Sequence, residues 1–104
     1  MYMNVNGERI YPFSTCRNQR YFSDVSVMCM MRMREMDSGK VPFDADEYAR
    51  LKALRERANY FYGLELPTAW LTGPECGEAK GLVEMALRNR ASRRANGIGM
   101  PNRI

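Results

Sequence analysis

The chain has 104 residues, a length that accommodates one domain with a single hydrophobic core. Hydrophobic residues make up 45% of it and charged residues 27%, which is ordinary for a globular protein and argues against intrinsic disorder. The net charge of +4 is compatible with an acidic or nucleic-acid partner but does not require one.

The composition disfavours several classes of protein. Because the chain contains no histidine, Ser-His-Asp and Cys-His catalysis are impossible, and we expect no enzyme and no cofactor. Arg32 interrupts the longest apolar run and the first residues lack a signal-peptide pattern, which predicts a cytoplasmic protein that does not enter a membrane. Three unclustered cysteines are expected to be reduced, partly buried thiols rather than metal ligands: Cys16, Cys29 and Cys76.

The N-terminal segment predicts a β-hairpin over residues 2–5 and 8–11. Asn6-Gly7 lies between two short stretches of alternating apolar and polar residues, and it favours a type I′ turn, in which both central residues have positive φ. Pro12 is expected to end the second strand. The polar residues 14–22 are expected to form a loop or a short helical turn. A two-stranded hairpin is marginal alone, so it must pack on another element.

Residues 25–36 fit two different elements. As a helix, the segment begins with Ser23 or Asp24 as the N-cap and ends near Gly39. As a strand, it places alternate residues on one face: Val25, Val27, Cys29, Met31 and Met33. The methionine and arginine content and the Asp-Ser-Gly ending favour the helix.

The clearest predicted helix follows Asp44 and ends at Gly63. Asp44 is the expected N-cap, with Glu47 three residues later as in a capping box. One apolar stripe comprises Tyr48, Leu51, Leu54, Ala58, Phe61 and Tyr62. A weaker strip on the opposite side predicts a second contact, within the fold or with a partner, through Ala49, Ala53 and Tyr60.

A connector over residues 64–71 leads to the last predicted helix, and its Trp70 is expected to cover the core. Thr72 or Gly73 caps this helix, which runs to about Ala95.

Two glycines interrupt the last helix. Gly77 and Gly81 each cost about 1 kcal/mol relative to alanine, and they are expected to let another backbone approach closely. Residues 98–104 show no periodicity and are expected to form a flexible or partner-bound tail.

One face of the last predicted helix is apolar in its first part and basic in its last part. At about 100° per residue, its apolar face continues into arginines. The face consists of Ala79, Leu82, Val83, Ala86 and Leu87, and Arg90, Arg93 and Arg94 continue it while Arg88 points elsewhere. Either the helix overhangs the body and presents a basic surface to phosphate or to a partner's carboxylates, or the arginines pair with the protein's own acids. The acids considered for such pairing are Asp44, Asp46 and Glu47.

Two further groups are candidate contact residues. Five methionines lie within residues 28–36, and methionine suits surfaces that must fit an irregular partner. In a helix, Met30 and Met31 lie opposite the expected core face, so the helix is either buried on all sides or covered there by the hairpin, a second protomer or a target. Tyr60 lies beside arginines and either stacks on a nucleic-acid base or packs on a neighbouring side chain.

Together these elements predict a single α-rich α+β domain over residues 1–104, with a short N-terminal β-hairpin packed on about three helices. If residues 25–36 are a strand, the fold becomes a three-stranded antiparallel sheet followed by two helices.

We expect a small protein that binds a larger protein or ribonucleoprotein and acts by steric occupation of its surface. One setting would be a phage or mobile-element inhibitor of a host nucleic-acid machine, serving evasion of host defence. The candidate partner- or phosphate-binding residues are Arg88, Arg90, Arg93, Arg94 and Arg103, with hydrophobic contacts from Met30, Met31 and Tyr60. Direct nucleic-acid binding through the arginine-rich helix end is the alternative. A homodimer formed through the methionine segment is a third arrangement.

Overall fold

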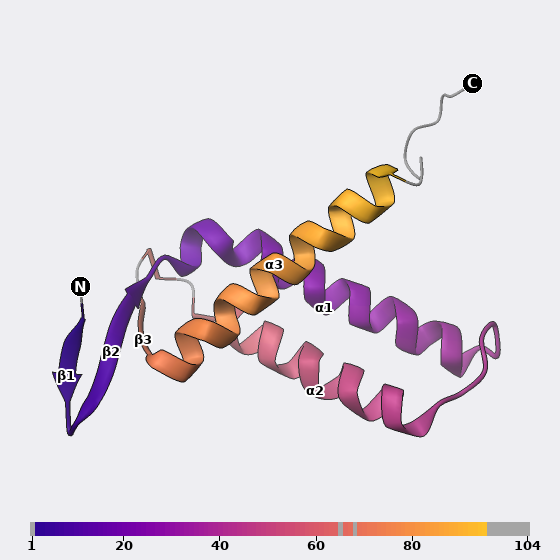
Figure 1. Cartoon of the computed structure of the whole chain (residues 1–104). Helices are drawn as coiled ribbons and strands as arrows, with labels where there is room; N and C mark the ends of the chain where they lie inside the picture. The colour runs from indigo at the N-terminus through magenta and orange to yellow at the C-terminus, as the bar shows by residue number, and fades with distance from the viewer. Residues whose placement is uncertain (1, 65, 68, 96–104) are drawn as a thin grey trace.

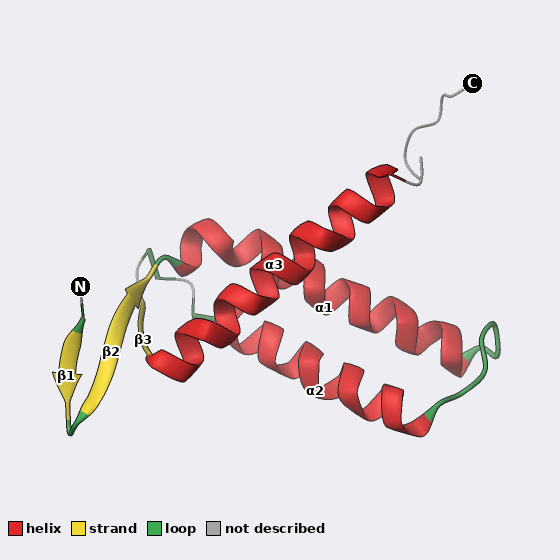
Figure 2. Cartoon of the chain, in the orientation of Figure 1, coloured by secondary structure: helices red, strands yellow, loops and turns green. Residues whose placement is uncertain are grey.

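Three helices and a three-stranded antiparallel sheet make up the protein (Figures 1 and 2). The computed structural model describes residues 2–64, 66–67 and 69–95. The elements in chain order are β1 (Met3–Val5), β2 (Glu8–Phe13), α1 (Thr15–Asp37), α2 (Ala45–Tyr62), β3 (Ala69–Thr72) and α3 (Gly73–Ala95). The predicted α-rich α+β fold is confirmed. The alternative with two helices is wrong, because residues 25–36 lie within α1.

The sheet has the strand order β1-β2-β3 and begins with the predicted hairpin. Asn6 (φ 52°) and Gly7 (φ 81°) both have positive φ, as the predicted type I′ turn requires. Pro12 does not end β2, which continues to Phe13. The reason is that β1 pairs with β2 only as far as Ile10, and β2 then continues against β3, where Pro12 is opposite Trp70.

Helix α1 begins at Thr15, well before the predicted cap at Ser23 or Asp24, so the expectation of a loop over residues 14–22 is wrong. Thr15 and Phe22 are buried and extend the helical spacing of the buried residues that follow. A distant loop also holds this end, because the Leu66 carbonyl accepts hydrogen bonds from the Thr15 hydroxyl and from the Cys16 N–H.

The predicted end of α1 is confirmed. Gly39 has φ 82° and follows the C-cap Ser38. The Lys40 N–H donates to the Glu35 carbonyl (2.9 Å) and the Gly39 N–H to the Met36 carbonyl (3.2 Å). These two bonds form a Schellman motif, in which glycine tolerates the left-handed conformation.

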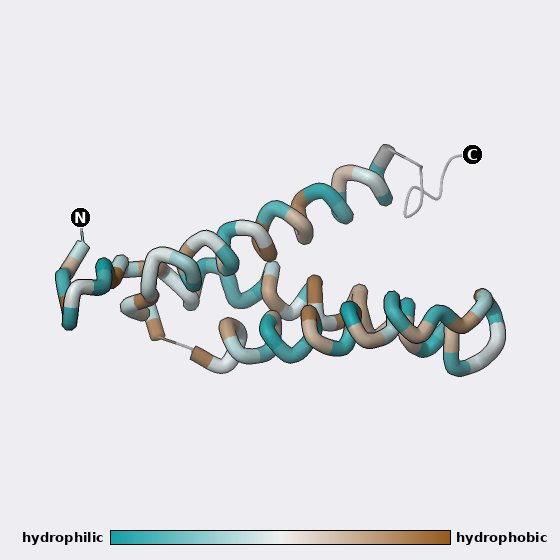
Figure 3. Tube along the Cα trace, turned by 60° about the horizontal axis from the view of Figure 1, so that its bottom comes forward, coloured by the Kyte–Doolittle hydropathy of each residue, from teal (hydrophilic) through white to brown (hydrophobic). Residues whose placement is uncertain are grey.

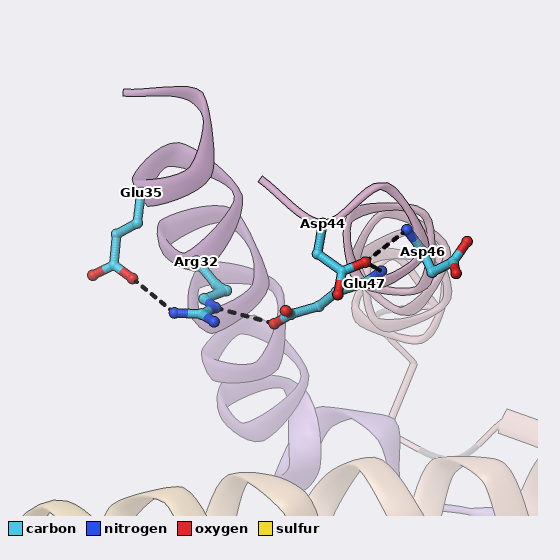
Figure 4. A network of polar contacts seen from close by, with 5 residues as sticks. All are labelled: Arg32, Glu35, Asp44, Asp46 and Glu47. Carbon is cyan, nitrogen blue, oxygen red and sulfur yellow. Dashed lines mark hydrogen bonds and ion pairs between the residues drawn. The ribbon is translucent and has the colours of Figure 1, made fainter. Parts of the chain in front are cut away.

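Helix α2 has the predicted bounds and cap. One Asp44 carboxylate oxygen accepts from the N–H groups of Asp46 (3.0 Å) and Glu47 (3.1 Å). The expected reciprocal bond from Glu47 is not made, because its side chain crosses to α1 and accepts from Arg32 Nε at 3.0 Å (Figure 4). The Asp44 cap therefore stabilises the first turn of α2, and the Glu47 side chain joins that turn to α1.

The core lies where α3 crosses the antiparallel pair of α1 and α2 (Figure 1). The rings of Phe22 from α1 and Phe61 from α2 are fully buried, with centroids 5.5 Å apart. The other buried members of the core are Phe13, Val25, Cys29, Ala58, Ala69, Leu71, Ala79, Leu82 and Ala86. Two residues assigned to apolar faces stay exposed, Tyr62 at 45% and Leu87 at 47%, because each lies at the edge of its face.

Two further expectations are corrected. Trp70 does not cover the core: it is 49% exposed, because the alternate residues Ala69 and Leu71 of β3 face inward instead. Gly77 and Gly81 do not admit a close backbone, since a Cβ built on either would meet nothing within 4 Å. The second strip of α2 is left exposed by the described part of the chain, so its contact with a partner stays a prediction: Ala49, Ala53 and Tyr60.

Candidate binding surface at the end of helix α3

The direction of α3 is determined at its first turn. The Thr72 hydroxyl accepts from the Glu75 N–H (3.2 Å), and the Thr72 N–H donates to Glu75 Oε1 (3.3 Å), which completes a capping box. Because β3 ends at Thr72, α3 starts directly from the sheet. It then crosses α1, and its C-terminal turns project beyond the body of the protein (Figures 1 and 3).

Arg90 belongs to the fold of the protein. Its Nε and Nη2 donate to Asp24 Oδ2 of α1, the former at 2.9 Å. Its guanidinium also lies over the Tyr21 ring, 4.7 Å from the centroid. Asp24 therefore is not the N-cap considered above but a mid-helix acceptor that joins α1 to α3. For this arginine, pairing with an internal acid is what the structure shows.

None of the acids expected to receive the arginines of α3, Asp44, Asp46 and Glu47, pairs with them among the described residues, and two of the three have other partners. Asp44 caps α2, and Glu47 binds Arg32, which also lies 3.6 Å from Glu35 across one helical turn (Figure 4). The hydrogen bond that Arg32 donates to the Glu47 carboxylate raises the pKa of Arg32 above its ordinary value.

The remaining basic residues of α3 extend past this anchor. Arg88, Arg93 and Arg94 are exposed, and within the described ranges none of them forms an ion pair. We call these three residues the basic arm. Arg93 and Arg94 flank the direction of the buried face, about one turn beyond Arg90, and Arg88 is on the other side of the helix. Arg103 lies outside the described residues, as does the whole of the tail 98–104.

An exposed leucine adjoins the basic arm, and a shallow hollow lies nearer the start of α3. Leu87 directly precedes Arg88 and is 47% exposed. The hollow lies between α3 and the N-terminal part of α1 and is lined by Phe13, Asn18, Lys80, Val83 and Glu84. Because its lining carries one cation and one anion, the hollow itself has no preference for either charge.

The methionine segment is only partly available as a contact surface. Met33 and Met36 are buried in the core side of α1, as predicted. Met30 is half-buried, and its sulfur accepts a hydrogen bond from Arg55 Nη2 at 3.8 Å. Met31 is 58% exposed, so α1 is not buried on all sides. Of the two methionines singled out, only Met31 is open to solvent.

Tyr60 is engaged within the protein. The guanidinium of Arg57 lies 4.7 Å from the centre of its ring, and its hydroxyl donates to Glu75 at 3.4 Å. Arg57 in turn donates two hydrogen bonds of 2.8 Å to Glu78 of α3. This pair lowers the pKa of the Glu78 carboxyl below its ordinary value. The aromatic and basic residues that suggested base stacking thus hold α2 to α3.

The cysteines are free thiols, but Cys16 is not partly buried as expected. Cys16 is exposed, Cys76 is half-buried, and Cys29 is buried in the core, where burial raises the pKa of its thiol and nearby Arg55 partly offsets the rise. Among the residues with described positions, no three His, Cys, Asp or Glu side chains gather closely enough to hold a metal ion.

No helix in the described part of the chain combines the length and apolar composition needed to cross a membrane. Comparison with protein families, with curated proteins and with solved structures finds no match for this chain.

Proposed function

We propose that the protein acts by binding, and that the basic arm docks on acidic side chains of a larger protein or ribonucleoprotein. The observation that carries this proposal is the contrast along one face of α3. Arg90 is paired with Asp24 and lies over Tyr21, whereas Arg93 and Arg94, one turn further, are exposed and have no carboxylate partner in the described part.

The helix dipole does not account for all three arginines of the basic arm. A helix dipole favours cations at the C-terminus, but its influence falls off within the last turn. Arg88 lies about two turns before Ala95, beyond that reach. Three exposed guanidinium groups on a projecting helix end are suited to planar, two-point recognition of carboxylates.

The surroundings of the basic arm favour a protein partner over nucleic acid. Leu87 offers an exposed apolar contact next to Arg88, and arginine beside an apolar anchor is typical of protein interfaces. Exposed Glu84, one turn earlier, would repel phosphate. The mechanism we propose is steric: the protein covers the partner surface on which the arm docks. That this partner is a host nucleic-acid machine stays a prediction.

The test is affinity capture with a charge-matched control. Replacing Arg88, Arg93 and Arg94 together by alanine should abolish capture of the protein partner, with or without nuclease treatment. The control replaces three exposed arginines of α1, Arg17, Arg20 and Arg34, so that the net charge changes equally. Equal capture by both triple variants would contradict the assignment of the site to α3.

Direct nucleic-acid binding is the second candidate, because three exposed arginines on one helix end are also able to contact successive phosphates. It predicts that log affinity falls with log salt with a slope of about −3 if all three arginines neutralise phosphates. A mobility-shift titration at two salt concentrations measures this slope. If no complex forms at low salt, this candidate is excluded.

A further inference from the structure

The strand register assigns each residue of the sheet to one of two faces. Cross-strand partners point to the same side, and the side alternates along each strand. Phe13 is opposite Ala69, and Tyr11 is opposite Leu71. Because Phe13, Ala69 and Leu71 are buried, this is the face that packs on the helices.

The other face is apolar as well. It comprises Met3, Val5, Glu8, Ile10, Pro12, Trp70 and Thr72, and we call it the outer sheet face. Met3 is 46%, Val5 42% and Trp70 49% exposed. An antiparallel sheet with one covered face normally carries polar residues on the other. Five apolar side chains, including the only tryptophan of the chain, therefore require a reason to be there.

The low charge of the outer sheet face makes a second copy of the chain the best-fitting partner for it. A chain of net charge +4 repels itself, so self-association needs a surface that keeps the basic groups apart. Glu8 is the only charged side chain of the outer sheet face, since Arg9 belongs to the other face, where it lies 4.8 Å from the centre of the Tyr2 ring. The sheet lies beside the start of α3, and the basic arm is at the other end of that helix (Figure 1).

The outer sheet face is also complementary to itself. Glu8 is at the turn end of β2, and Trp70, opposite Pro12, is near the other end. A two-fold axis that sets the two β2 strands antiparallel places Glu8 of each copy over Pro12 of the other, one strand spacing of about 4.8 Å from Trp70. The indole N–H is a donor and the carboxylate an acceptor. Neither group has a hydrogen-bond partner among the described residues.

We infer that the outer sheet face binds the same face of a second copy, forming a two-fold symmetric dimer whose basic arms point away from each other. A stable complex buries about 800 Å² per partner, more than these five side chains offer. The dimer is therefore weak and reversible, half-formed at about 10–100 µM. This surface is distinct from the methionine segment, and the inference does not depend on the proposed docking of the basic arm.

The experiment combines sedimentation velocity with tryptophan fluorescence over about 5 µM to about 1 mM protein. Because Trp70 is the only tryptophan, its emission reports on the outer sheet face alone. The mass should rise from 12.0 kDa towards twice that value. Over the same range, the emission should shift to the blue and acrylamide should quench it less.

Two matched variants locate the contact. Val5→Lys places a charge in the outer sheet face and should leave a folded monomer with exposed Trp70 at every concentration. Leu87→Lys adds the same charge at a residue of similar exposure on α3 and should dimerise like the parent chain. Glu8→Gln keeps the shape but removes the charged acceptor, and should weaken the dimer about tenfold.

Three results would overturn the inference. One is a parent chain that stays monomeric to about 1 mM. Another is association that persists in the Val5→Lys variant, which would locate the contact elsewhere. The third is a Trp70 that becomes shielded only when a different protein is added, which would assign the outer sheet face to another partner.

Discussion

Arg57 makes the most extensive side-chain contacts of any basic residue in the described part. It donates two 2.8 Å hydrogen bonds to Glu78, and its guanidinium lies within 5.2 Å of the ring centres of both Tyr60 and Phe61. The pair joins the end of α2 to the start of α3, which meet at few other points. Both side chains remain more than a third exposed, so solvent screens their attraction.

The lowered pKa of Glu78 predicts a pH-dependent contribution to stability. A carboxyl whose pKa is lower in the folded chain stabilises the fold above its unfolded pKa, near 4.5, and the contribution is lost as pH falls through the lower folded value. Glu78→Gln should therefore reduce the free energy of unfolding by at most about 1 kcal/mol at pH 7. Urea unfolding between pH 7 and pH 2 should show this difference shrink below about pH 4.5.

The control for that measurement is Glu84→Gln, on the same helix at an exposed position without an ion pair in the described ranges. It should change stability little at any pH. A deficit of the Glu78 variant that stays constant with pH would show that packing, rather than charge, links these helices.

At the scale of the elements, α3 is held by a capping box at its start and, further along, by its buried face and by the pair of Arg90 with Asp24. The capping box of Thr72 and Glu75 compensates unsatisfied N–H groups of the first turn. Gly77 and Gly81 follow it within the helix, where glycine costs conformational entropy without any neighbour that requires its small size. These two residues weaken the element that carries the basic arm.

Alanine at either glycine should stabilise the protein. Gly77→Ala and Gly81→Ala each remove flexibility from the unfolded chain, for a gain of about 0.5–1 kcal/mol that thermal or urea unfolding can measure. Gly39→Ala is the informative contrast, since its φ of 82° makes alanine strained there and the variant should be less stable. Loss of stability in the helical variants would mean that a close neighbour does meet these residues.

At the scale of the whole molecule, one small core joins all three helices to the inner face of the sheet. Phe61 lies at its centre, with its ring 5.5 Å from Phe22 and 5.1 Å from Tyr60. The outer sheet face and the basic arm both lie outside this core, the former beside the start of α3 and the latter at its other end (Figure 1). The two surfaces proposed to bind partners thus depend on a limited amount of buried apolar surface.

Truncation of the central ring should therefore be severe. Phe61→Ala is expected to lower the free energy of unfolding by about 3–5 kcal/mol, and a milder Phe61→Leu variant covers the case in which alanine prevents folding. Tyr62→Ala, the adjacent but 45% exposed position, should change it by less than about 1 kcal/mol. Chemical denaturation of the variants measures all of these. Similar losses at Phe61 and Tyr62 would contradict the placement of the core.

The sequence by itself determined the parts whose signals are local. The type I′ turn follows from Asn6-Gly7, and the bounds of α2 follow from Asp44 and Gly63, because turns and caps depend on residues a few positions apart. The apolar face of α3 and its continuation into arginines were likewise readable from the helical period.

Only the tertiary structure decided what depends on residues far apart in the chain. The first turns of α1 form against the loop at Leu66, and β3 is a strand because β2 offers it an edge. Arg90 differs from Arg93 and Arg94 only because Asp24, 66 residues earlier, lies within its reach and the helix then leaves the body. A pattern along the chain specifies which side of a helix faces inward. Whether a given arginine meets a carboxylate depends on how the packed elements cross.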